Sequence, residues 1–300
     1  MAYNIVRQSD QNLFRGLSGC IWQAARIPIE EIRENPDRGA FFWDDFLQVA
    51  GGGAPTATQT VTILTGAQCY KFQGGPTTFG TCSPVASGAS AGPSAISIPI
   101  GQLQMKALAT AHDNCAIEPG DILSTPVGQF GVNATVGTLP KIAFEAKIKL
   151  DAADATQAMF IGLAEANLTS GQNTLFNNTE VLQNKSMIGL YTNATNVIQP
   201  VYGKNGTAFV NVGAGGTLVA NTYTKLGFYL DPIDTVNWFI QWFQDGVSIG
   251  RQKTNLQASS AFPGGVALTP LLYVQNAGAG GVARLATIDW WACGELLDFS

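Results

Sequence analysis

The sequence predicts an all-β protein: an antiparallel β-sandwich preceded by an N-terminal arm that contains a short helix. Short segments of alternating hydrophobicity follow one another from residue 141 to the end of the chain. Turn sequences such as Lys204-Asn205-Gly206 separate them, and Asn-Gly supplies the positive φ angles that a tight hairpin needs. No amphipathic helical pattern lies between these segments, so consecutive strands are expected to form two packed antiparallel sheets.

Composition limits the classes of partner. The chain has 300 residues, of which 46% are hydrophobic, enough for a full core, and only 12% are charged. With so few charges, either other subunits cover part of the surface or Thr, Asn, Gln and Ser keep it soluble. The net charge is −5 and basic residues form no run, which argues against a nucleic-acid partner. No apolar run is long enough to span a membrane, and the first residues lack a signal-peptide core, so we expect synthesis in a cytosol and no membrane partner.

Residues 1–40 form the predicted arm. A helix is expected from Pro28 to about Asn35, because Pro28 suits a helix start and Pro36 ends it. The arm is rich in arginine and aromatic residues, which are common at protein interfaces. It therefore docks either on a neighbouring subunit or on its own domain. For the first case, the predicted partner-binding residues are Arg7, Phe14, Arg15, Trp22, Arg26 and Arg33.

Residues 41–140 contain a first strand and a loop-rich β segment. The first strand is predicted over 39–49, and Gly51-Gly52-Gly53 ends it. Further short strands are expected at 61–64, 68–72, 97–102 and 104–110. The segment is either a separate subdomain or an excursion from the sandwich.

Residues 141–300 form the predicted main sandwich. In the strand 141–150, Ile142, Phe144 and Ile148 share one face, and Glu145 and Lys147 lie on the other. The segment from Val236 places Trp238, Ile240 and Trp242 on one face. Other strands are predicted at 159–165, 187–192, 197–202, 207–212, 223–230, 247–250 and 268–275.

The last strand, about 283–296, contains Trp290 and Trp291, which must face opposite sides of a sheet. Both faces of this strand are therefore expected to be covered. Strict alternation would place Ile288 and Trp290 on one face, with Asp289 and Trp291 on the other. We also predict that this strand lies beside, or in the sheet facing, the strand around Trp43.

No motif predicts catalysis. Gly88-Ala89-Ser90-Ala91-Gly92 matches a serine-nucleophile pattern, but no strand-to-helix turn surrounds it. His112 is the one histidine, too little for a metal site. Five cysteines include Cys69 and Cys82, for which free thiols are favoured over a disulfide. The carboxylates that a glycan-cleaving enzyme would use do not form a compact motif: Glu145, Glu165, Asp289 and Glu295. We therefore expect no catalytic residue, no cofactor, no metal and no enzymatic activity.

Several short motifs, among them Trp43-Asp44-Asp45-Phe46, Phe160-Ile161-Gly162-Leu163 and Thr287-Ile288-Asp289-Trp290, occur here in an order that resembles one protein family. It is that of the capsid decoration (cement) proteins of tailed bacteriophages, virion structural proteins with a lectin-like, jelly-roll or concanavalin-like sandwich. The resemblance covers about residues 41–50 and 141–296. It implies a homotrimer on the capsid surface that binds the major capsid protein and stabilises the shell across capsomer junctions.

A carbohydrate-binding or receptor-binding tail component is the alternative function. In that case, exposed aromatic side chains would stack on sugars, with Trp238, Trp242 and Trp291 as candidates.

Overall fold

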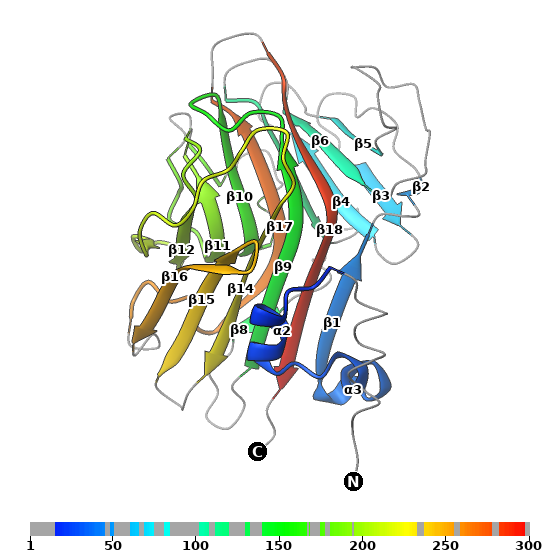
Figure 1. Cartoon of the computed structure of the whole chain (residues 1–300), viewed down its shortest axis with the longest axis vertical. Helices are drawn as coiled ribbons and strands as arrows, with labels where there is room; N and C mark the ends of the chain where they lie inside the picture. The colour runs from blue at the N-terminus through cyan, green and yellow to red at the C-terminus, as the bar shows by residue number, and fades with distance from the viewer. Residues whose placement is uncertain are drawn as a thin grey trace.

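The computed structural model describes residues 16–45, 49–50, 61–65, 69–74, 81–84, 102–107, 112–119, 130–132, 140–166, 168, 175–177, 181–193, 195–232, 237–254, 259–277 and 282–297. These residues form a β-sandwich of two antiparallel sheets, as predicted (Figure 1). No helix among them is long and apolar enough to cross a membrane.

Sheet A is the sheet that carries the arm. Its strands lie in the spatial order β16 (Val247–Thr254), β15 (Trp238–Gln244), β14 (Thr224–Pro232), β9 (Pro140–Leu150), β18 (Arg284–Leu297), β6 (Leu103–Ala107) and β5 (Thr81–Pro84), and β1 (Gly39–Asp44) also pairs with β18.

Sheet B faces sheet A across the core. Its strands lie in the order β13 (Val210–Asn211), β12 (Gln199–Gly203), β11 (Met187–Thr192), β10 (Gln157–Ala164), β17 (Val266–Asn276), β7 (Asn114–Pro119), β4 (Cys69–Gly74), β3 (Val61–Thr65) and β2 (Val49–Ala50), and β8 (Phe130–Val132) also pairs with β17.

The main core lies between the sheets and follows the predicted alternation. Phe144 and Ile148 of β9 enter it, as do Trp238 and Trp242 of β15, and all four are buried. Removing such aliphatic and aromatic surface from water stabilises the sandwich by about 1.5–3 kcal/mol for each side chain.

Strands from the segment 41–140 belong to both sheets. β1, β5 and β6 extend sheet A, whereas β2, β3, β4, β7 and β8 extend sheet B. The segment thus contributes strands to both sheets of the sandwich. The domain boundaries at residues 40 and 140 stay predictions.

The arm contains two short helices that lie on the outer face of sheet A. α3 (Ile29–Glu34) is the predicted helix, followed by the 3₁₀ turn η1 (Pro36–Arg38). α2 (Gly19–Ala25) was not predicted; it ends where Arg26 adopts φ +54°, a left-handed conformation typical of a helix end. Ile21 and Trp22 pack against Tyr229 and Phe243 of the sheet in an apolar cluster.

The outer face of sheet B is also covered by its own chain. Phe160, Tyr191 and Tyr273 of its strands pack with Leu175 and Phe176, which come from the connection between β10 and β11. The sandwich therefore has apolar side chains on both outer faces, each covered by a segment of this chain.

The closing strand lies beside the first strand, as predicted. β1 pairs antiparallel with β18, and Trp43 lies opposite Ala292. The predicted alternation of β18 is wrong beyond Ile288, because the register with β9 shifts between Ile288 and Trp290. This irregularity inserts Asp289, so that Ile288 and Trp291 both enter the core.

Both tryptophans of β18 are covered, as predicted. Trp291 is fully buried in the core. Trp290 is 6% exposed and stacks on Trp43, with ring centroids 5.1 Å apart.

Candidate functional site

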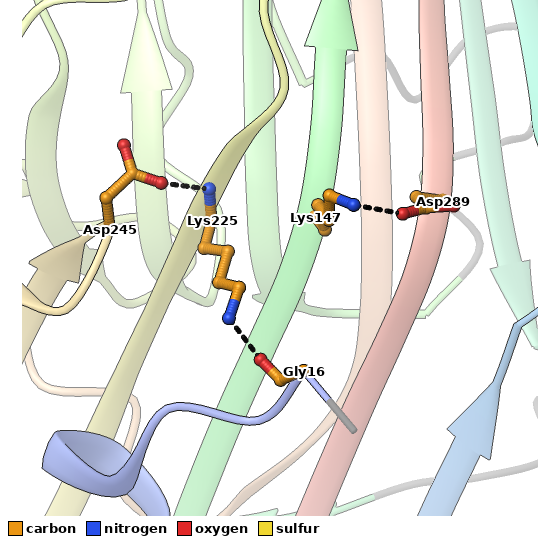
Figure 2. Close-up of polar contacts among 5 residues, drawn as sticks. All are labelled: Gly16, Lys147, Lys225, Asp245 and Asp289. Atoms are coloured by element: carbon orange, nitrogen blue, oxygen red, sulfur yellow. Dashed lines mark hydrogen bonds and ion pairs between the residues drawn. The ribbon is translucent and has the colours of Figure 1, made fainter. Parts of the chain in front are cut away.

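The outer face of sheet A carries the candidate site. The cross-strand register places Lys225 of β14 opposite Lys147 of β9, and Trp290 of β18 opposite Lys147 on its other side. Lys149 lies two residues further along β9 on the same face. α2 lies over β9 and β14 (Figure 1). Its Trp22 contacts Glu145, and Lys147 lies beyond the helix (Figure 2). The face thus has a covered part under α2 and a second part around Lys147.

In the covered part, Glu145 fastens the arm to the sheet. Its Oε2 atom accepts hydrogen bonds from the backbone N–H of Ser18 and from Nε1 of Trp22, each at 2.9 Å. The Glu145 side chain is buried, and this burial raises the pKa of its carboxyl group, while the hydrogen bonds from Ser18 and Trp22 oppose the shift. The main role of Glu145 in this conformation is therefore to hold α2.

Gly227 makes room for this contact. A Cβ atom on Gly227 would lie 2.5 Å from the carbonyl oxygen of Phe144 and 2.7 Å from Cδ1 of Ile21. A side chain at this position would push α2 away from β14. Glycine is thus required by the close approach of the arm.

Beyond α2, a ring and three charged groups lie together. Nζ of Lys147 and Oδ2 of Asp289 form an ion pair at 2.5 Å (Figure 2). The ammonium groups of Lys147 and Lys149 lie 5.0 and 4.9 Å from the centre of the Tyr223 ring. Burial raises the pKa of Tyr223 to about 12, and the negative charge of Asp289 adds to the shift. Tyr223 therefore stays a neutral phenol at physiological pH.

A pair of stacked rings, Trp290 and Trp43, lies beside the group formed by Tyr223, Lys147, Lys149 and Asp289. Nζ of Lys225 lies 5.9 Å from the centre of the Trp290 ring and donates a hydrogen bond to the carbonyl oxygen of Gly16 (Figure 2). The carboxylate of Asp245 accepts from the backbone N–H of Lys225 at 2.9 Å. Trp43 lies on the other side of Trp290 and is half-buried. Two half-buried rings, Tyr223 and Trp43, thus flank the paired charges.

The irregularity in β18 creates this arrangement. Because Asp289 is the inserted residue, Asp289 and Trp290 both reach the outer face, where they meet Lys147 and Trp43. Strict alternation would have put one of the two into the core. The sequence carries only one weak signal for this, a charged residue beside two tryptophans in an otherwise apolar strand.

The predicted partner-binding residues are only partly described. Trp22 is 5% exposed and packs against its own chain, and Arg26 is exposed at the end of α2. Arg7, Phe14 and Arg15, and the side chain of Arg33, lie outside the described residues. The described part of the arm packs on its own domain, and partner binding through this set stays a prediction.

The aromatic residues predicted to stack on sugars are the wrong ones. Trp238, Trp242 and Trp291 are all fully buried between the sheets, because each falls on the core side of its strand. Tyr223 and Trp43, which the sequence did not single out for this role, lie at the outer face instead.

The four candidate carboxylates are dispersed. Glu145 and Asp289 both lie on the outer face of sheet A, each with the partner described above. Glu165 follows β10 in sheet B and pairs with Lys185 at 3.5 Å. Glu295 is 8% exposed and accepts from the backbone N–H of Gly131 at 3.3 Å.

The other motifs add no chemistry to the site. The described residues contain no group of three or more side chains that could hold a metal ion. His112 lies in a turn with φ +68° before β7. Residues 88–92 and the side chains of Cys69 and Cys82 lie outside the described residues, whereas Cys20, Cys115 and Cys293 are free thiols.

No protein-family model and no curated protein matches the sequence. Solved structures do match the fold. Peanut lectin matches with a TM-score of 0.52 and 10% identity, over 87% of this chain and 99% of the lectin. An endo-1,3-β-glucanase from Streptomyces sioyaensis matches with a TM-score of 0.50 and 14% identity, over 85% of this chain and 95% of the enzyme. A Shewanella oneidensis MR-1 protein of unknown function matches with a TM-score of 0.51 and 12% identity, over 88% of this chain and 89% of that one.

These matches correct one prediction and confirm another. The prediction that the chain is not an enzyme is wrong, because the glucanase has the same fold. The fold therefore does not exclude an enzymatic role for this chain. Nothing in these three matches shows a capsid decoration protein, and that part of the resemblance stays a prediction. What the comparisons establish is the fold: the chain is a lectin-like, jelly-roll β-sandwich.

Proposed function

We propose that this protein binds carbohydrate on the outer face of sheet A, on the part that lies beyond α2. The observation that carries the proposal is the grouping of Tyr223, Trp43 and the Lys147–Asp289 ion pair on that face. The likeness to peanut lectin supports the proposal at the level of the fold.

The chemistry of a sugar fits such a surface. A pyranose ring presents apolar C–H groups on its faces and hydroxyl groups around its edge. A ligand of this kind is bound by an aromatic ring together with a few hydrogen-bonding groups that fix its orientation. Tyr223 and Trp43 supply the rings, Lys147 donates, and Asp289 accepts. Gln104 of β6 lies opposite Thr287 on the outer face of sheet A, and its side-chain amide can both donate and accept a hydrogen bond.

Two aromatic variants test the proposal. Tyr223→Ala and Trp43→Ala are each expected to weaken glycan binding about three- to tenfold, since a specific aromatic contact contributes about 0.5–1.5 kcal/mol. Binding of the whole chain is measured first on a glycan array and then by calorimetry with the strongest ligand.

Phe209→Ala is the matched control. Phe209 is half-buried and packs on Tyr191 at the outer face of sheet B, so its loss removes an aromatic side chain from the opposite side of the sandwich. This variant should bind normally. A wild-type chain that binds no glycan, or a Phe209→Ala variant that alone loses binding, would contradict the proposed site.

A second candidate function is that of a virion structural protein on a capsid surface, bound to the major capsid protein as a homotrimer. The sparse charge, 12% of residues, favours it, because a surface that a partner covers needs fewer charged side chains to stay soluble. Deleting residues 1–15 tests it: this removes Arg7, Phe14 and Arg15 but keeps the helices that cover sheet A. Loss of capsid occupancy with unchanged stability is expected, and normal occupancy would remove the arm from the proposal.

A further inference from the structure

We infer that the carbohydrate is anionic, a polysaccharide with uronate carboxylates, and that Lys149 and Lys106 bind its charge. This inference rests on the proposed function and names the class of ligand. Its starting point is an unusual pairing: Lys147 and Lys225 lie directly opposite each other on neighbouring strands. Like charges in this position destabilise a sheet, so either nearby carboxylates or a bound anion must offset the repulsion.

More cations lie on the same face. Lys149 follows on β9 and lies opposite Thr287, which in turn lies opposite Gln104 of β6. Lys106, two residues after Gln104, shares its outward face, because Leu103, Met105 and Ala107 of β6 all enter the core. We call Lys106, Lys147, Lys149 and Lys225 the cationic face. These four cations share one face of a chain whose net charge is −5.

Few carboxylates compensate the cationic face. Asp289 pairs with Lys147. Asp245 accepts from the backbone N–H of Lys225, whose ammonium group instead donates to the carbonyl of Gly16 (Figure 2). Glu145 is buried beneath α2. Lys106 and Lys149 form no ion pair with any residue that the structure describes, so their charge is available to an anion. The ammonium group of Lys225, by contrast, is held by the carbonyl of Gly16 and lies over the Trp290 ring.

The arrangement favours a carboxylate-bearing glycan over a nucleic acid. Lys147 already holds one carboxylate, that of Asp289, so the face accommodates this group. The four lysines of the cationic face provide point charges, not the planar fork with which arginine binds phosphate bidentately. The ammonium groups of Lys147 and Lys149 lie over the Tyr223 ring, so a sugar that contacts this ring beside them would bring its carboxylate to them.

Binding is tested on the whole chain with four probes: a linear polyuronate, a neutral β-glucan of the same length, a sulfated galactan and duplex DNA. We expect binding of the polyuronate that weakens as salt is raised from low to physiological concentration, because salt screens exposed charges. Lys149→Gln is expected to reduce this affinity about tenfold, the loss of one charge-assisted hydrogen bond, and Lys106→Gln by a smaller factor.

Lys204→Gln is the charge-matched control. Lys204 follows β12 in sheet B and donates to the carbonyl oxygen of Gly264 at 3.4 Å, so this variant makes the same charge change away from the cationic face. It should bind the polyuronate as the wild type does.

The outcomes separate this inference from the proposed function. Binding of the neutral glucan as tightly as the polyuronate would overturn the inference and leave carbohydrate binding intact. Preference for the sulfated galactan or for DNA would overturn it as well, as would Lys149→Gln and Lys106→Gln variants with wild-type affinity. Absence of binding to every glycan would overturn both.

Discussion

At the scale of single residues, burial changes the charge state of Glu295 near neutral pH. This side chain, near the end of β18, is 8% exposed, and its burial raises the pKa of Glu295 from 4.5 to about 7. The hydrogen bond from the backbone N–H of Gly131 opposes the shift without cancelling it. The folded state therefore binds this proton more tightly than the unfolded state does.

The sign of the pH dependence follows from this difference. The contribution of Glu295 to the free energy of unfolding is fully present below pH 4.5 and is lost as the pH rises through about 7. Glu295→Gln keeps the shape and removes the titration, so the variant should be more stable than the wild type at pH 8.5 by up to about 3 kcal/mol. At pH 4.5 the two should be nearly equal. Urea unfolding at both pH values measures this, and an equal difference at both would show that the Glu295 proton is not involved.

Residue-scale features were the least predictable from sequence. Alternation along β9 and β15 correctly assigned Phe144, Trp238 and Trp242 to the core side. It failed in β18, where the extra residue Asp289 shifts every following side chain to the other face. An inserted residue depends on the register between two strands, which a single strand's pattern does not contain.

At the scale of elements, Glu145 couples the arm to sheet A. Replacing Glu145 with alanine removes the acceptor for Ser18 and Trp22, and it leaves the buried Nε1–H of Trp22 and the part-buried N–H of Ser18 without a partner. We expect α2 to detach more often, which exposes the Arg26–Ile27 peptide bond to trypsin. The rate of cleavage after Arg26 should rise about tenfold or more, since each lost bond to a charged group costs about 1.5–3 kcal/mol.

Glu31→Ala is the control for this experiment. Glu31 of α3 forms an ion pair with Arg38 at 2.6 Å, but the two side chains are 58% and 51% exposed. Exposed pairs of this kind contribute little to stability. Cleavage after Arg26 should therefore stay at the wild-type rate in Glu31→Ala, and a similar rate in Glu145→Ala would mean that Glu145 does not hold the arm.

The two helices of the arm show what local sequence can predict. α3 was predicted because Pro28 and Pro36 bracket it and acidic residues occupy its first turn. α2 was not, because Gly19 and Cys20 favour helix weakly. It forms because Ile21 and Trp22 bury against sheet A, a tertiary contact that no local signal reports.

At the scale of the whole molecule, the sandwich was predictable and the candidate site was not. Hydrophobic alternation is a local property, and it can be read from single strands such as β9 and β15. The site instead requires β9, β14 and β18 to lie side by side, so that Lys147, Tyr223 and Asp289 meet. Residues as far apart as 147 and 289 come together only through the sheet topology.

The same topology predicts that residues 141–300 do not fold by themselves. β18 is flanked by β9 on one side and by β1 and β6 on the other, while β17 is flanked by β10 and by β7 and β8. A fragment without residues 1–140 loses the second neighbour of both central strands. It also uncovers the apolar side chains of sheet A under α2, among them Tyr229 and Phe243.

Unpaired strand edges and exposed apolar faces promote association. The isolated fragment 141–300 is therefore expected to lack a cooperative unfolding transition and to aggregate, whereas the whole chain unfolds cooperatively. Adding residues 1–140 as a separate chain should restore soluble protein, because β1, β6 and β7 can then pair with β18 and β17. Near-ultraviolet circular dichroism and size-exclusion chromatography measure both effects. A soluble, cooperatively folding fragment would instead mean that the sandwich is complete without its first half, and that strands β1 to β8 are an addition to it.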